Sequence, residues 1–158
     1  MRFVMIALLV VLGSVHPAMA QDAAATYTKM APVDQYLMAD REAEIALARS
    51  AAPESISRDA EIQVLARHGF QTAVKGKNGF LCIVGRGWSS AADADFWNPK
   101  VRVPMCLNAA AARTYLLRIA KISDLALAGR TPIQVNQAIA TAIGKKQLPP
   151  MEPGQCAT

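Results

Sequence analysis

The feature that most limits what this chain can fold into is an apolar run at its N-terminus. Residues 3–12 are apolar without a break, follow the cation Arg2, and lead to a small-x-small cleavage pattern at Ala18 and Ala20. The run is about ten residues long, whereas a membrane-spanning helix needs about twenty. We therefore expect residues 1–20 to be a cleaved signal peptide, and the mature protein to be periplasmic or secreted.

Cleavage leaves 138 of the 158 residues, a length that suits one domain with one core. The chain has 17 Lys+Arg against 12 Asp+Glu, and losing Arg2 changes this to 16 against 12, or +4. A charge this small and scattered favours weak attraction to anionic surfaces and does not indicate a nucleic-acid binder. No later segment is long and apolar enough to span a bilayer, so we expect no transmembrane anchor after cleavage.

Helix signals lie at both ends of the mature chain. After a loose leader over residues 21–33, Asp34 can cap a helix that runs to about Ala51 and ends before Pro53. A helix of about twenty residues is expected from the cap at Asn108 to Gly129.

A last helix is expected from Thr131, with Pro132 at its first position, to Gly144. We place a single domain at residues 34–146 and an unstructured Pro-rich tail at 147–158.

Strand signals lie between the helices. Residues 61–67 are ambiguous between helix and strand, and we favour a strand because a turn at His68-Gly69 and a second run at 70–75 follow. Asn78-Gly79 is a strong hairpin signal before an apolar, β-rich run at 80–84. The fold class expected is α+β, with a small three-stranded antiparallel meander packed against flanking helices. Residues 85–104 are expected to form a long irregular loop.

Two segments carry a family resemblance: residues 73–84, and residues 96–106 with their Trp-Asn-Pro sequence. Through them the chain resembles uncharacterised exported proteins from environmental bacteria, over roughly residues 44–154. This family has no assigned activity, so the resemblance implies no role for any residue here. Its members continue past the Glu-Pro-Gly segment at residues 152–154, which implies a truncated copy with reduced or lost activity.

Cysteines offer a covalent link. In an oxidising compartment a Cys pair is most simply a disulfide, and we expect Cys82 to bridge Cys106. Two free thiols, or a bridge to Cys156, are the alternatives. A metal site with His68 is disfavoured, because the sequence has neither a Cys-x-x-Cys motif nor a pair of histidines in the mature chain. We expect no metal and no cofactor.

Catalytic signals are weak. His68, the one histidine of the mature chain, could act as a general acid or base with Asp93 or Asp95. A turn position beside Gly69 also suits an exposed histidine with no special role. Common nucleophile and phosphate-binding motifs are missing from the sequence, so an enzyme is not favoured. The two aspartates with Asn98 could hold Ca²⁺, but Asx turns explain them as well.

Basic and aromatic residues gather in and near the hairpin and the long loop. An exposed Trp beside Arg or Lys can stack on a sugar or ring and hold an anionic group. The candidate ligand-binding residues are Trp88, Trp97, Lys75, Arg86, Lys100 and Arg102. The alternative is that both Trp side chains pack the loop onto the sheet while the charges face water.

The leading hypothesis is therefore a non-catalytic exported accessory or binding module of the cell envelope, whose partner is an anionic envelope component. The rivals are a small hydrolase that uses His68 with Asp93 or Asp95, and a truncated family member that has lost its activity.

Overall fold

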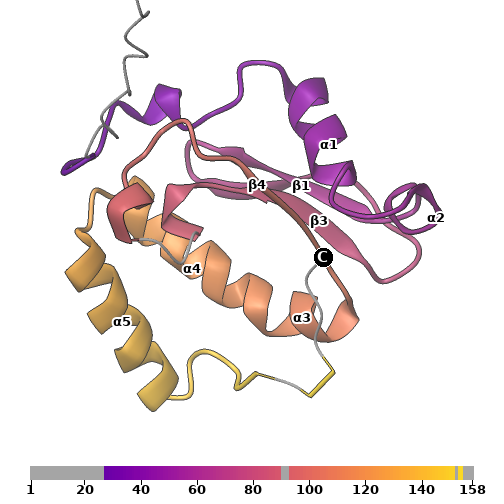
Figure 1. Cartoon of the computed structure of the whole chain (residues 1–158). Helices are drawn as coiled ribbons and strands as arrows, with labels where there is room; N and C mark the ends of the chain where they lie inside the picture. The colour runs from indigo at the N-terminus through magenta and orange to yellow at the C-terminus, as the bar shows by residue number, and fades with distance from the viewer. Residues whose placement is uncertain (1–26, 90–92, 152, 155–158) are drawn as a thin grey trace, which may run out of the picture.

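The computed structural model describes residues 27–89, 93–151 and 153–154. The expected signal peptide, residues 1–20, and Cys156 lie outside the described residues. The element order is η1 (Val33–Gln35), α1 (Arg41–Arg49), α2 (Glu54–Ser57), β1 (Glu61–Ala66), β2 (Gly69–Val74), β3 (Leu81–Gly85), η2 (Gly87–Ser89), η3 (Asp93–Asp95), β4 (Val103–Leu107), α3 (Ala109–Arg113), α4 (Tyr115–Leu127) and α5 (Pro132–Gly144). The fold is α+β, as the sequence predicts (Figure 1).

The sheet differs from the expected meander. It has four strands in the order β2-β1-β3-β4, and β3 runs parallel to β1, while β1–β2 and β3–β4 are antiparallel. The sheet is therefore mixed, and the prediction of a three-stranded antiparallel meander is correct only for the β1–β2 hairpin. The fourth strand was missed because Pro104 argues against a strand; β4 lies at a sheet edge, where proline is tolerated.

Gly76 explains why Asn78-Gly79 does not turn a hairpin. After β2 the chain crosses the start of β1 to reach β3, and a Cβ on Gly76 would lie 2.2 Å from the backbone nitrogen of Glu61. Only glycine permits this close approach of two backbones. Asn78 instead closes a local turn, accepting from the Phe80 N–H and donating to the carbonyl of Ile56.

Helices cover both faces of the sheet (Figure 1). Because side chains alternate along a strand, Cys82 and Val84 face α1, where they pack with Ile45 and Ala48. The opposite face packs on α3 and α4 through Leu81, Ile83, Met105, Leu107, Ala111, Leu116 and Ile119. Both faces of the sheet are therefore buried against helices, as the expected packing against flanking helices requires.

Helix boundaries follow the capping signals with two exceptions. Thr131 and Gln134 form the capping box of α5, with Pro132 in its first turn. The N-terminal helix begins later than expected, because Asp40 rather than Asp34 accepts from the first backbone N–H groups of α1. The long C-terminal helix is divided at Thr114, which separates α3 from α4.

Candidate functional site

The loop predicted to bind a ligand is folded into the core. Trp88 and Trp97 are only 4% and 5% exposed. The Trp88 indole N–H donates to the Ser123 hydroxyl at 3.0 Å, and its ring packs on Tyr36 with ring centroids 4.8 Å apart. Trp97 meets Phe96 edge-to-face at 4.7 Å. Neither indole presents a face to solvent for stacking. The alternative interpretation, in which both Trp side chains pack the loop against the rest of the domain, therefore holds for the two rings.

Arg86 is the most deeply buried of the candidate ligand residues, at 1% exposed. Its guanidinium donates to the Glu44 carboxylate at 2.8 Å and to the backbone carbonyls of Tyr36 and Val84. The same Glu44 oxygen accepts from the Leu65 N–H at 3.1 Å. Burial lowers the pKa of Arg86, and the neighbouring Glu44 carboxylate opposes that shift. Arg86 thus ties α1, β1 and β3 together and is not available to a ligand.

The remaining cations of the candidate set are dispersed. Lys75 follows β2, at the end of the sheet where β1 and β3 begin, whereas Lys100 precedes β4 at the opposite end and the opposite edge. Arg102 is half-buried and donates to the carbonyls of Pro99 and Val101. Burial lowers the pKa of Arg102, with a further decrease from Arg86. These side chains do not converge on one ligand site.

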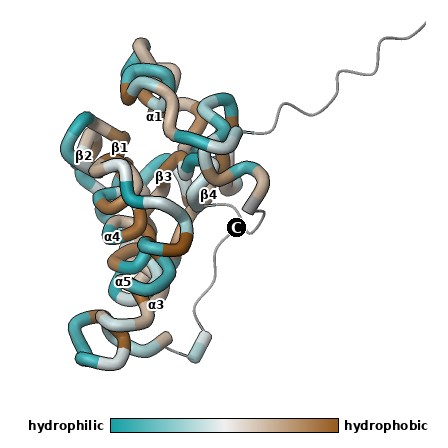
Figure 2. Tube along the Cα trace, turned by 90° about the vertical axis from the view of Figure 1, so that its left-hand side faces the viewer, coloured by the Kyte–Doolittle hydropathy of each residue, from teal (hydrophilic) through white to brown (hydrophobic). Residues whose placement is uncertain are grey.

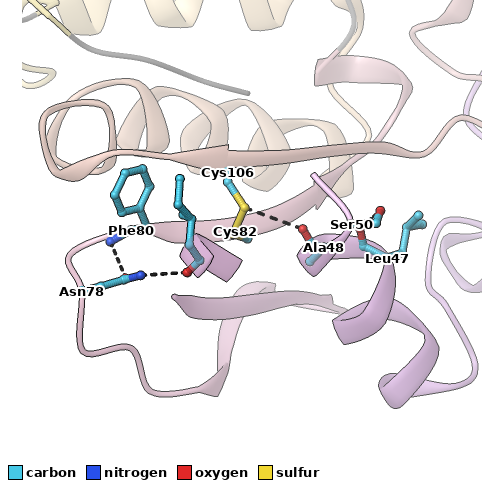
Figure 3. The surroundings of a disulfide bond; sticks show 8 residues. Leu47, Ala48, Ser50, Asn78, Phe80, Cys82 and Cys106 are labelled. Carbon is cyan, nitrogen blue, oxygen red and sulfur yellow. Dashed lines mark hydrogen bonds between the residues drawn. A yellow bond between two sulfur atoms is a disulfide. The ribbon is translucent and has the colours of Figure 1, made fainter. Parts of the chain in front are cut away.

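Cys82 and Cys106 form a disulfide (Figure 3). The two residues are directly opposite one another in the β3–β4 register, and both are buried. The Cys106 sulfur lies 3.8 Å from the carbonyl oxygen of Ala48, so the bridge is covered by α1. Within the described ranges, no group of three or more His, Cys, Asp or Glu side chains is placed to hold a metal ion.

His68 is exposed in the β1–β2 turn, beside a carboxylate that sequence reasoning did not consider. It shares an open hollow of about 290 Å³ with Arg67, Asp124, Leu127 and Ala128, a set that we call the β2 corner. Among the described residues, Asp124 and not Asp95 lines this hollow. The Asp95 carboxylate accepts from the Asn98 side-chain amide at 3.0 Å, and the Asn98 oxygen accepts from the Lys100 N–H at 3.0 Å, as in an Asx turn. The side chain of Asp93 lies outside the described part.

Asp124 comes close to the backbone at the start of β2. A Cβ on Gly69 would lie 2.7 Å from an Asp124 oxygen, and Gly69 has a φ of +105°, a conformation that suits glycine. Burial raises the pKa of Asp124, while Lys121 on the same helix opposes the shift. Arg67 forms an exposed ion pair with Asp34, which lies in η1. The β2 corner therefore brings together a guanidinium, an imidazole and a partly desolvated carboxylate, next to the apolar side chains of Leu127 and Ala128.

The sequence carried one faint signal for Asp124: it is the one acidic residue of α4. Its position beside His68, 56 residues earlier in the chain, depends on the packing of α4 against β2. A second open hollow, of about 370 Å³, lies between α4 and α5. Its Gln134 amide is already engaged in the capping box of α5, so the β2 corner is the better candidate site.

No helix within residues 27–89 and 93–151 combines the length and the hydropathy needed to cross a membrane. Comparison of the chain with protein-family models, with curated proteins and with solved structures finds no match.

Proposed function

We propose that this protein is an exported, non-catalytic accessory or binding module of the cell envelope, which contacts an anionic partner through the β2 corner and the adjoining sheet edge. Export after cleavage behind Ala20 is compatible with the disulfide, since such bonds persist in oxidising compartments. We assign the contact surface to the β2 corner, which holds His68, and not to the aromatic loop, because Trp88 and Trp97 of that loop are buried.

The observation that carries this proposal is the convergence of Arg67, His68 and Asp124 on one open hollow that Leu127 and Ala128 also line. A concave site with a few convergent polar groups over apolar contacts is typical of binding sites. Arg67 offers guanidinium nitrogens beyond the one that meets Asp34, and an exposed ion pair of this kind is weak enough to exchange for a partner's carboxylate.

The test is site-specific photo-crosslinking in the producing cell. We expect a photoreactive residue at position 68 to give discrete adducts in the envelope fraction, and the same residue at exposed position 137 on α5 to give none. Adducts of equal yield from both positions, or from neither, would contradict the proposed surface. Retention of the precursor in the cytoplasm would contradict export.

The second candidate is a small hydrolase, and the shared hollow favours it in a corrected form. Asp124 replaces Asp93 and Asp95 as the carboxylate beside His68. The described residues place no hydroxyl or thiol nucleophile in the hollow, so a hydrolase would need water as its nucleophile. Ester hydrolysis that is lost in both His68→Ala and Asp124→Asn would establish this activity, and equal rates in all three proteins would refute it.

A further inference from the structure

β2 is an edge strand whose outer side carries no neighbouring strand in the described part of the chain. Figure 2 shows β2 at the outer edge of the sheet, with α1 on one side and α4 on the other. The outer edge of a strand presents unpaired N–H and C=O groups, and proteins usually protect it with charged residues or proline. Residues 69–74, Gly-Phe-Gln-Thr-Ala-Val, contain neither, and Gln71 and Thr72 are exposed.

We propose that this edge accepts an extended acidic polypeptide by strand addition, so that the anionic partner of the proposed function is a protein segment. The inference rests on the proposed function, because β2 begins at the β2 corner. Strand addition gives affinity through main-chain hydrogen bonds, and side chains at the ends of the segment then give specificity.

Charge at the two ends of β2 indicates the acidic partner. Arg67 and His68 precede the strand, where Arg67 is paired with Asp34 and His68 lies beside Asp124, and Lys75 and Lys77 follow it; these four basic side chains are exposed. The excess of positive charge therefore lies at the end of the strand that leads to Lys75 and Lys77. A strand of six residues spans about 20 Å, so carboxylates about six to eight residues apart on an added strand would meet both groups. The half-buried Glu61 on the neighbouring strand β1 accepts hydrogen bonds from the side chains of Gln63 and Thr72.

The same charges disfavour a second copy of this chain as the occupant. Antiparallel pairing of β2 with itself sets Arg67 and His68 of one copy near Lys75 and Lys77 of the other. Parallel pairing sets each cation beside its own equivalent. Parallel pairing brings like charges together, which is destabilising in a sheet. In antiparallel pairing Lys75 and Lys77 repel Arg67, and Asp34 and Asp124 beside Arg67 offset part of that repulsion, so this arrangement is the less disfavoured of the two. An extended segment with acidic ends avoids this repulsion.

The register of β1–β2 defines where the partner pairs. Ile62 is opposite Val74 and Gln63 is opposite Thr72, so Ala73 has no opposing residue. A bulge of this kind bends and twists the strand. The regular part of the edge is therefore Gly69–Thr72, and the partner's main-chain hydrogen bonds are expected there.

The experiment uses the mature chain labelled with ¹⁵N and a terminally blocked ten-residue peptide, with alternating valine and threonine at its centre and two glutamates at each end. We expect the peptide to shift the amides of residues 69–72 and to protect those whose N–H groups point away from β1, and a peptide with lysines in place of the glutamates to do neither. The variant Lys75→Gln/Lys77→Gln should bind about 2- to 30-fold more weakly, the range that two exposed ion pairs supply. The matched control is Lys145→Gln/Lys146→Gln, which removes the same charge beyond α5 and should bind as the unmodified chain does.

Four results would overturn the inference. The β2 amides could remain unprotected, or both double variants could weaken binding equally, or anionic phospholipid vesicles could bind through Lys75 and Lys77 while the peptide does not. Self-association that protects the same amides without peptide would assign the edge to a second copy. If the β2 amides do not respond while position 68 still gives crosslinks, the inference fails and the proposed function stands.

Discussion

Removing the carboxylate of Glu44 should destabilise the protein more than any surface substitution. In Glu44→Ala the guanidinium of Arg86 loses its counterion while it stays buried at 1% exposed, and the Leu65 N–H loses its acceptor. Breaking a buried ion pair by removing one partner costs about 3–5 kcal/mol. A domain of this size has a free energy of unfolding of about 5–15 kcal/mol, so the loss is a large share of the total.

The assay is urea unfolding of the mature chain near neutral pH, followed by the fluorescence of the buried Trp88 and Trp97. The matched control is Glu54→Ala, which breaks an exposed 3.7 Å pair with Arg58 and should change the midpoint little. Should Glu44→Ala not fold, Glu44→Gln keeps an oxygen for the Leu65 N–H and should lose less stability.

A double variant separates an unpaired charge from lost packing. Glu44→Leu/Arg86→Met replaces the pair with apolar side chains of similar length, and such replacements are often close to neutral. We expect the double variant to be more stable than Glu44→Ala by about 1–3 kcal/mol, although the carbonyl of Tyr36 loses a donor. The reasoning is refuted if Glu44→Ala costs less than about 1 kcal/mol, or if the double variant is the less stable of the two.

Three further predictions concern the disulfide, the strand crossover and the buried tyrosine. Replacing Cys82 and Cys106 with alanine, a pair 24 residues apart, should lower the free energy of unfolding by about 3 kcal/mol, and an unchanged urea midpoint would contradict this. Gly76→Ala should cost more than about 2 kcal/mol because its Cβ would overlap the backbone of β1, while Gly144→Ala, which has open space, should cost nothing by the same measurement. Burial raises the pKa of Tyr36 above its ordinary value of about 10, so the folded state keeps a proton that the unfolded state loses, and stability should fall as pH rises beyond that value. Unfolding free energies measured from neutral to alkaline pH should show a shallower fall in Tyr36→Phe than in the unmodified chain.

Local signals predicted the elements whose formation depends on neighbouring residues. Thr131 and Pro132 mark the start of α5, and Gly129, with φ of +73°, ends the preceding helix. The turn after β1 and the pairing of Cys82 with Cys106 were also predicted, because strand alternation and an oxidising compartment restrict the choices.

Long-range contacts decided the partners of those elements. Asn78-Gly79 has the composition of a hairpin turn, but Gly76 brings the chain across the start of β1, so β3 pairs with β1 and not with β2. Arg86 is a residue type that often binds anionic ligands, but its buried ion pair with Glu44, which precedes it by 42 residues, makes it a core residue. Neither the strand pairing nor the burial of Arg86 can be predicted from a short stretch of sequence, because each depends on a contact between segments that are distant in the chain.

The sequence by itself determined the α+β class and the cap of α5 and favoured the Cys82–Cys106 pair over its alternatives, because capping, turn and redox preferences act over short distances or on few candidates. Only the tertiary structure decided the strand order, the burial of Trp88 and Arg86, and the meeting of His68 with Asp124. The physical reason is that the burial of a side chain depends on how the whole domain packs around it. A tryptophan or arginine in a loop is a binding residue or a core residue according to what the rest of the chain places against it.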